Sequence, residues 1–257
     1  MPEGHTVHRI ARDLQPLVGS PVSVSSPQGR FPAAALDGEL LASVDAYGKH
    51  LLLRFSSTAV VHVHLGMKGV WLRYPPEVEP MRQVRIRLAG RDVAWDLVAP
   101  SRCEVLSPER AAALVAGLGP DPLRPDADRT SALDALSASS AAIGAVLLDQ
   151  SVLAGVGNVF RAEALHAIGV HPAAPARGVA RTVLEELWTT LQRMMSRAVA
   201  DGRIVTVDAP DRLAVPESEA RRVYKREHCD DCGAAVVVGQ VGGRTSYHCP
   251  VEQPNPG

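Results

Sequence analysis

The first ten residues, "MPEGHTVHRI", place two chemically useful groups side by side. If the initiator Met1 is removed, Pro2 becomes the N-terminus, and its secondary amine is followed directly by the carboxylate of Glu3. An α-amino group has a pKa of about 8, against about 10.4 for a lysine side chain, so more of it is neutral and nucleophilic near pH 7. The chain therefore begins either with an ordinary processed start or with an amine nucleophile beside an acid–base group.

Three cysteines near the C-terminus have the spacing of a metal site. Cys229 and Cys232 are separated by two residues, and Cys249 follows after sixteen residues that read as a β-hairpin. Two such knuckles that face each other across a hairpin hold one zinc ion tetrahedrally. The position at which this pattern wants a fourth ligand carries Glu252 instead of a cysteine. We predict a structural zinc site formed by the three cysteines and Glu252.

Two histidines compete with Glu252 for the fourth corner of this site. His228 and His248 each precede a cysteine directly, and either ring would serve if the knuckle bends. A carboxylate is a legitimate but less usual ligand of structural zinc. The remaining alternative is a hairpin that has lost its metal and is held by packing alone.

A glycine-rich turn in "AGVGNVFRAEAL" is a candidate phosphate-binding element. We expect a helix to end near Gln150, a turn to pass through Gly155 and Gly157, and a second helix to start after Asn158 with its amide dipoles aimed at the turn. Taken alone, the same pattern also fits a packed helical hairpin with glycine caps.

The elements that must position these residues follow from periodicity. Apolar residues recur at helical spacing from residue 7 to 17, and short β-rich runs with turns between them extend from residue 22 to about 106. Prolines and acidic residues in "LGPDPLRPDADRT" break both patterns, and the chain is helical beyond them. We predict an α+β protein with a β-sandwich domain and leading helix over 1–115, a linker over 116–130, a helical domain over 131–220 and a zinc-finger hairpin over 221–257.

Composition narrows the class of protein. The 257 residues are 46% hydrophobic, enough to bury real cores, and 27 basic against 28 acidic residues give a formal net charge of -1. The protein has no overall positive charge that would attract a nucleic acid. A nucleic-acid partner would therefore have to bind to local basic patches. The N-terminus lacks an apolar signal segment, and no apolar run reaches the length of a membrane span. We expect a cytoplasmic, monomeric protein.

Together the motifs resemble the formamidopyrimidine-DNA glycosylase and endonuclease VIII family of DNA repair enzymes. The matches run in order along nearly the whole chain, as "MPEG", "GKHLLLRF", "HLGMKG", "AGVGNVFRAEAL" and "VYKRE" followed by the cysteines. The resemblance implies a β-sandwich with a leading helix, a helix-two-turn-helix region and a zinc finger. It also implies a partner, double-stranded DNA that contains oxidised bases or abasic sites.

The resemblance assigns roles to five residues. Pro2 would attack C1′ of the damaged nucleotide, and Glu3 would be its acid–base partner at the sugar ring. Lys49 in "YGKHLLLRF" and Arg244 in "GGRTSYHC" would hold phosphates beside the lesion, and we count both with the catalytic residues. Asn158 would bind backbone phosphate from the glycine-rich turn. Without the resemblance, Lys49 would be one more solvated lysine.

Two further DNA contacts are expected. Met67 in "HLGMKG" is the candidate wedge that fills the hole left by an extruded nucleotide, although a methionine after a β run is more often a core residue. Lys225 lies in a dense basic run that either contacts phosphates or forms a solvated face. The other members of this run are Arg221, Arg222 and Arg226.

The resemblance gives a substrate preference as well. The oxidised-purine branch of the family carries an Arg-Phe element that "WDLVAPSRCEVLS" lacks, and the start "MPEG" is closer to the endonuclease VIII branch. We therefore expect removal of oxidised pyrimidines through a Schiff base on Pro2, followed by β/δ-elimination. One alternative is a catalytically inactive damaged-DNA-binding protein of the same fold. Another is an RNA-binding module, in which the "PE" start and the β half would have no purpose.

Overall fold

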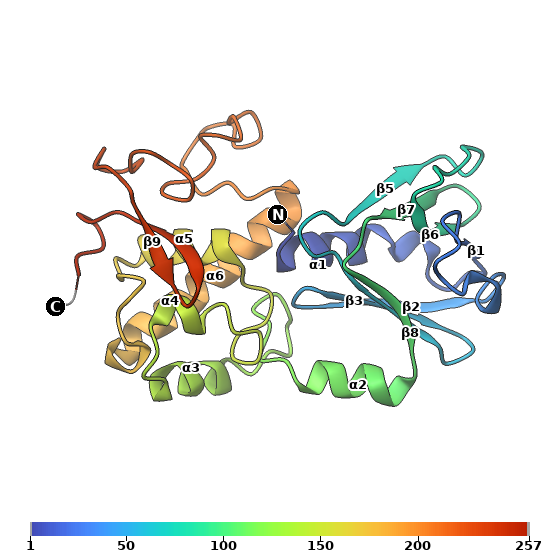
Figure 1. Ribbon diagram of the computed structural model, residues 1–257, viewed down its shortest axis with the longest axis horizontal. Helices are drawn as coiled ribbons and strands as arrows, with labels where there is room; N and C mark the ends of the chain where they lie inside the picture. The colour runs from blue at the N-terminus through green and yellow to red at the C-terminus, as the bar shows by residue number, and fades with distance from the viewer. Residues whose placement is uncertain (1, 256–257) are drawn as a thin grey trace. The chain divides into compact units, whose positions relative to one another are not determined.

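The computed structural model describes residues 2–255 of the chain. By contacts between its residues the chain divides into two compact units, one that ends at Gly117 and one that begins at Leu118. Figure 1 labels the helices and strands of both units.

The first unit begins with the predicted helix. Helix α1 spans Gly4–Asp13, and the 3₁₀ turn η1 follows over Gln15–Leu17. Val7 and Ala11 lie one turn apart on the buried face, and the helix packs against strands β2 and β3. Gly19 then adopts φ 80°, a left-handed conformation that favours glycine and turns the chain toward the first strand.

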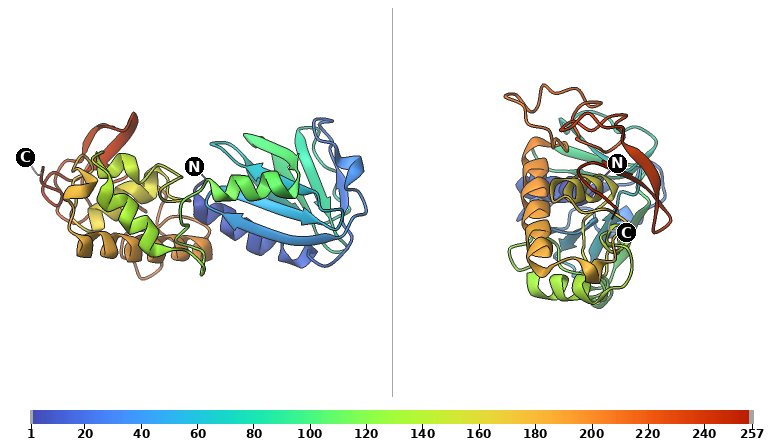
Figure 2. Two further views of the ribbon diagram at one scale, coloured as in Figure 1. Left: turned by 90° about the horizontal axis from the view of Figure 1, so that it is seen from below. Right: turned by 90° about the vertical axis from the view of Figure 1, so that its left-hand side faces the viewer.

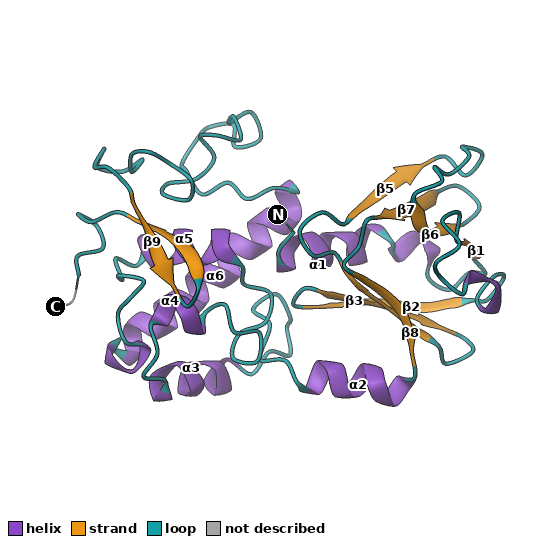
Figure 3. Ribbon diagram, viewed as in Figure 1, coloured by secondary structure: helices purple, strands orange, loops and turns teal. Residues whose placement is uncertain are grey.

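Eight strands form the predicted β-sandwich. The strands are β1 (Ser23–Ser25), β2 (Leu41–Tyr47), β3 (His50–Phe55), β4 (Val60–His64), β5 (Val70–Tyr74), β6 (Val84–Ala89), β7 (Ala94–Val98) and β8 (Arg102–Leu106), with a 3₁₀ turn η2 at Ala33–Ala35. One sheet has the antiparallel order β1-β6-β7-β5 and the other β2-β3-β4-β8. Leu53 and Val61 from one sheet share a core with Leu88 and Leu97 from the other. This confirms that the β half is a sandwich (Figure 3).

Helix α2, Pro108–Ala116, was not expected from the sequence. The Ser107 hydroxyl accepts a hydrogen bond from the backbone N–H of Arg110, and a proline occupies the first helical position. Ala111 of the helix packs on Leu52 and Val60, so α2 covers the outer face of the sheet β2-β3-β4-β8 (Figure 2, left). The sequence contains this helix-start signal, Ser107 followed by proline. The helix was not predicted because it is short and follows directly after a strand.

The second unit is helical, as predicted. It contains α3 (Arg129–Ala138), α4 (Ile143–Val146), α5 (Asn158–Ala167), a 3₁₀ turn η3 (Ala176–Gly178), α6 (Arg181–Asp201) and a hairpin of β9 (Val237–Val241) and β10 (Arg244–His248). The helix before the glycine-rich turn ends at Val146, not near Gln150. The hairpin turns through Gly242 and Gly243, both at positive φ, which is typical of a two-residue turn that matches strand twist.

The proline-rich segment that was predicted to be a linker is packed at the start of the second unit. The backbone N–H of Gly119 donates to the Gln150 carbonyl at 2.9 Å, and that of Ala154 donates to the Pro120 carbonyl at 3.0 Å. Asp121 is fully buried, and its carboxylate accepts from the backbone N–H of Leu123 at 2.9 Å. These bonds attach the segment to the glycine-rich turn of the second unit. Among the residues that the structure describes, every helix is too short or too polar to cross a lipid bilayer.

Candidate functional site

The start of α1 fixes the candidate acid–base group. Glu3 occupies the N-cap position and is only 1% exposed, and its carbonyl accepts from the backbone N–H of Thr6 at 3.0 Å. The carboxylate therefore stands at the positive end of the helix dipole, where negative charge is favoured. Pro2, directly before it, is half-buried. Burial of Glu3 holds it beside Pro2 in a fixed position.

Two turns of the same unit carry Lys49 and Met67. Gly48, at φ 56°, and Lys49 form a two-residue turn between β2 and β3, where Tyr47 pairs with His50. Met67 lies in the turn between β4 and β5 and is 73% exposed, so it is not a core residue. Figure 1 shows both turns and the start of α1 at the same end of this unit.

A chain of hydrogen bonds that was not predicted from the sequence begins next to Lys49. His62 is buried; its Nδ1 lies 3.1 Å from Oε1 of Glu104, and its Nε2 lies 2.9 Å from Nδ1 of His50. Because a carboxylate only accepts, the proton of His62 is on Nδ1, its Nε2 accepts, and Nδ1 of His50 donates. The outer nitrogen of His50, Nε2, is consequently an acceptor. The alternation "HVH" at residues 62–64 is the signal that His62 and His64 share one face of β4, and His50 lies opposite His64 on β3.

His64 stands beside His50 in the opposite tautomer. The backbone N–H of Gly66 donates to Nδ1 of His64 at 3.1 Å, so the proton of this ring is on Nε2. The His50 and His64 ring centroids are 5.1 Å apart, edge to face. Burial lowers the pKa of all three histidines, that of His50 to about 3, so the rings are neutral at pH 7. The pair thus presents an acceptor and a donor next to Lys49.

In the second unit, helix α5 holds the hairpin. Nδ2 of Asn158 donates to the Thr245 carbonyl at 2.9 Å. The fully buried Arg161 donates to the same carbonyl at 2.5 Å, and to the carbonyls of Gly144 and Val241 at 3.3 and 3.4 Å. Oδ1 of Asn158 is buried without a hydrogen-bond partner in the described residues. Asn158 therefore uses one of its two amide N–H donors within the protein, and the other is left for a phosphate oxygen, which the acceptor Oδ1 could not bind.

The cations of this unit that the sequence singled out fall into two groups. Three members of the basic run are ion-paired: Arg221 with Glu217, Arg222 with Asp208 and Asp231, and Arg226 with Asp230. Lys225 is exposed, at φ 57°, with its ammonium 5.7 Å from the centroid of the Tyr224 ring. Arg244 is exposed at the first position of β10 and has no ion-pair partner in the described part of the chain. Of the cations predicted from the sequence, Lys225 and Arg244 are therefore the two that remain available to an external phosphate.

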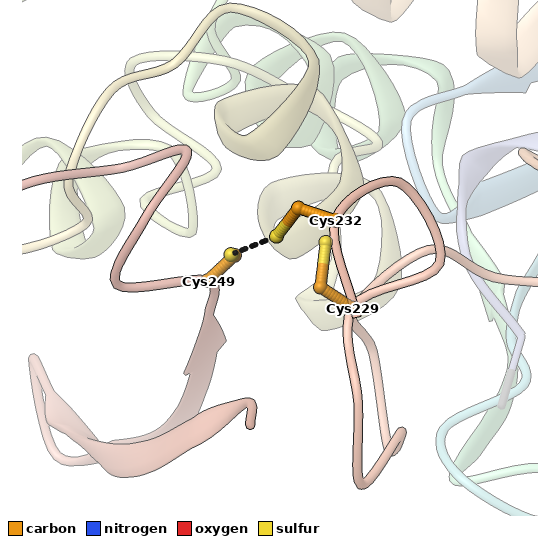
Figure 4. A group of neighbouring side chains, drawn as sticks. All are labelled: Cys229, Cys232 and Cys249. Atoms are coloured by element: carbon orange, nitrogen blue, oxygen red, sulfur yellow. Dashed lines mark hydrogen bonds between the residues drawn. The ribbon is translucent and has the colours of Figure 1, made fainter. Parts of the chain in front are cut away.

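The three cysteines meet as the spacing predicts. Their sulfur atoms all lie within 4.8 Å of one another, and those of Cys232 and Cys249 are 3.4 Å apart (Figure 4). Cys229 and Cys249 are buried, whereas Cys232 is exposed. The backbone N–H of Glu252 donates to the sulfur of Cys249 at 3.5 Å, an interaction that favours a thiolate. Three sulfur donors so arranged fit a structural zinc ion.

The expected fourth ligand does not join this cluster. Glu252 is exposed, and its carboxylate lies in neither of the two groups of potential metal ligands that the described residues form. His228 and His248 also lie outside both groups. The second group is instead His166, Cys229 and Asp231, in which Nε2 of His166 is 3.3 Å from the Cys229 sulfur. His166 had no sequence signal, because it lies 63 positions before Cys229.

Comparison with known protein families and sequences gives consistent matches. Residues 1–98 match the formamidopyrimidine-DNA glycosylase N-terminal domain, and residues 118–209 match the formamidopyrimidine-DNA glycosylase H2TH domain. Endonuclease 8 1 of Mycobacterium tuberculosis is 41% identical to the chain, over 98% of this chain and 100% of that protein. The formamidopyrimidine-DNA glycosylase of Laribacter hongkongensis is 30% identical, again over 98% and 100%.

Solved structures match the fold as well. A crystal structure of wild-type Lactococcus lactis Fpg in complex with DNA containing N7-benzyl-Fapy-dG superposes with a TM-score of 0.81. The match covers 99% of this chain and 100% of that one at 22% identity, so it bears on the fold alone.

Proposed function

This chain belongs to the formamidopyrimidine-DNA glycosylase and endonuclease VIII family of DNA glycosylases of base excision repair, and from that premise we propose how it acts. It removes an oxidised base and then cleaves the strand as a lyase. The observation that carries this proposal is the position of Pro2 directly before the buried Glu3 at the N-terminus of α1.

The chemistry begins at the Pro2 nitrogen once Met1 has been removed. The amine forms a bond to C1′ of the damaged nucleotide while the bond from C1′ to the base breaks, and the base leaves with a proton. The adduct opens to an iminium, which is always cationic because proline is a secondary amine. Glu3 moves protons at the sugar during ring opening. A base then removes a C2′ proton, the electron pair of that bond moves into the iminium, and the resulting enamine expels the 3′ phosphate from C3′. A second elimination expels the 5′ phosphate from C5′, and water hydrolyses the iminium to release the sugar fragment from Pro2.

Phosphate binding is distributed over short segments of both units. Lys49 and the donor Nε2–H of His64 serve the DNA backbone from the first unit. Arg244 and Lys225 serve it from the second unit, where both are exposed. Asn158 offers its second amide N–H to the backbone phosphate, and by holding the Thr245 carbonyl it also fixes the backbone that presents Arg244. Met67, at 73% exposure, is suited to enter the space left by an extruded nucleotide.

Zinc has a structural part in this proposal. Cys229, Cys232 and Cys249 would hold it. When bound, the ion cross-links the end of the hairpin to the preceding knuckle and takes no part in bond breaking.

Two observations support oxidised pyrimidines as the substrates. The chain lacks the Arg-Phe element expected of the oxidised-purine branch. It is also more similar to Endonuclease 8 1 of M. tuberculosis, at 41% identity, than to the formamidopyrimidine-DNA glycosylase of L. hongkongensis, at 30%.

Borohydride trapping on duplexes with different oxidised bases tests the proposal. We expect a covalent protein–DNA adduct with wild-type protein, and its near loss in Pro2→Gly or with an uncleaved N-terminal tag. Pro75→Gly, in the exposed loop after β5, is the matched control and should trap normally. Adduct formation that survives the tag would remove Pro2 from the role of nucleophile. Binding of damaged DNA without any adduct would instead identify an inactive binding protein.

A further inference from the structure

We propose that His166, and not Glu252, supplies the fourth ligand of the zinc site through its Nε2 atom. This inference rests on the proposed zinc site and concerns only its composition. The assignment also changes which segments the metal would connect. With His166, in the last turn of α5, the metal would join the cysteines to that helix, whereas Glu252 lies in the segment that follows β10.

The distance between donors supports this assignment. In a tetrahedral zinc site with bonds of about 2.3 Å to sulfur and about 2.0 Å to nitrogen, two such donors lie about 3.5 Å apart. Nε2 of His166 is 3.3 Å from the Cys229 sulfur. Cys229 belongs to both groups of potential metal ligands. One group contains Cys232 and Cys249, and the other contains His166 and Asp231.

The His166 ring is buried, and one of its two nitrogens has no hydrogen-bond partner among the described residues. The ring is 4% exposed, and the nitrogen in question is Nδ1. Its other neighbour, the Asp231 carboxylate, is 3.7 Å from Nε2, which is too long for a hydrogen bond. That carboxylate is already paired with Arg222. Among the described residues, Nε2 therefore has the Cys229 sulfur as its one partner within hydrogen-bond distance, and with the proton of the neutral ring on Nδ1 it can offer its lone pair to a metal.

The final geometry requires a small rearrangement. His166 and the other two cysteines are not all within 4.8 Å of one another in the structure, so either the ring or the knuckle must move to close the tetrahedron. Asp231 does not oppose a turn of the ring, because its carboxylate is 3.7 Å from Nε2, too long for a hydrogen bond. The other side of the site is fixed more firmly. The buried Gln253 side chain accepts from the backbone N–H of Cys249 at 3.0 Å and donates to the Val170 carbonyl at 2.8 Å.

Cobalt(II) in place of zinc in the full chain provides the test, because its absorption reports the donor atoms. Wild-type protein should bind one equivalent, with a charge-transfer band typical of three thiolates. His166→Cys should raise that band by about one third, since a fourth thiolate is added. His166→Ala should release zinc to a chelator about tenfold faster or more, whereas the matched variant Glu252→Ala should leave both spectrum and release rate unchanged.

Imidazole nitrogen NMR of the zinc-loaded wild-type chain separates ligation from a neighbouring hydrogen bond. A His166 Nε2 that is coordinated carries no proton, whereas one that donates to the Cys229 thiolate does. This measurement needs no variant and holds even if His166→Ala unfolds. A protonated Nε2, or a spectrum and release rate that respond to Glu252→Ala alone, would overturn the assignment. Failure of the wild-type chain to bind any metal would instead reject the zinc site itself.

Discussion

The side-chain amide of Asn158 donates a hydrogen bond to the main-chain oxygen of Thr245 across 2.9 Å, which joins the first residue of α5 to the strand that begins at Arg244. Asn158→Asp keeps the shape of the side chain but turns a carboxylate oxygen toward that carbonyl. We expect a loss of about 2–3 kcal/mol in the free energy of unfolding, since two acceptors then face each other in a buried site. Urea unfolding measures this loss. A variant as stable as wild type would show that the bond contributes nothing.

Arg244 should set part of the salt dependence of DNA binding. The logarithm of affinity falls against the logarithm of salt concentration with a slope of about -0.9 for each neutralised phosphate, so Arg244→Ala should flatten the slope by about one unit. Arg226→Ala is the matched control, because Arg226 is already paired with Asp230. Binding of an abasic duplex measured from low to moderate salt distinguishes the two. Equal slopes for wild type and Arg244→Ala would mean that Arg244 neutralises no phosphate of the DNA.

Glu163 is the buried anchor of the segment that precedes the cysteines. Its carboxylate accepts from the backbone N–H groups of Arg222, Val223 and Tyr224, and from the Thr206 hydroxyl. Glu163→Gln exchanges one acceptor oxygen for an NH₂ group that faces these donors, so we expect a loss of about 3–5 kcal/mol of stability. Denaturant unfolding checks this value.

Glu186→Gln serves as the control for that change, because Glu186 is exposed on α6. It should leave the unfolding midpoint within error of wild type. If both glutamate variants lost the same amount of stability, the buried hydrogen bonds would not be the reason.

The three histidines of the first unit should make the protein less stable in mild acid. Each has a lowered pKa in the folded state, so below pH 6.5 the unfolded chain binds protons that the folded chain does not. Stability should therefore fall as pH decreases from about 6.5 toward the folded-state pKa values, by at most about 1.4 kcal/mol per pH unit for each ring.

Removal of one ring should reduce this dependence. His50→Gln deletes the group whose pKa is lowered most clearly, to about 3. Between pH 6.5 and 5 the free energy of unfolding should then depend less steeply on pH, by up to the slope that uptake of one proton produces. Denaturant unfolding at several pH values gives the slope directly. An identical slope in the variant would mean that His50 is protonated equally in the folded and unfolded chain.

Local patterns were enough to predict much of the fold. Val7 and Leu14 are buried as the helical spacing requires, and the alternating strands produced the sandwich. The cysteine spacing alone was enough to predict that Cys229, Cys232 and Cys249 lie close together. In each case the residues that determine the structure are close in sequence or follow a regular period, so their pattern is visible without the fold.

Long-range contacts could not be predicted in this way. The bond from Asn158 to Thr245 spans 87 positions, and the approach of His166 to Cys229 spans 63. Helix α5 also obscures its own role, because its residues from Val159 to His166 are buried on every side and show no amphipathic stripe. Charged residues in such a helix, here Arg161 and Glu163, mark internal anchors, which sequence reasoning did not use.

Helix α5 also imposes an order of assembly on the newly made chain. It is complete at Ala167, whereas the segments that it anchors, from Thr206 to the hairpin, are synthesised later. Strand β9 is almost wholly exposed, and a lone two-stranded hairpin is marginal in water, so these segments gain stable structure only on a helix that already exists. A chain whose synthesis stops before Thr245 therefore leaves Asn158 and Arg161 without the carbonyl that both bind, and exposes this helix to chaperones and proteases.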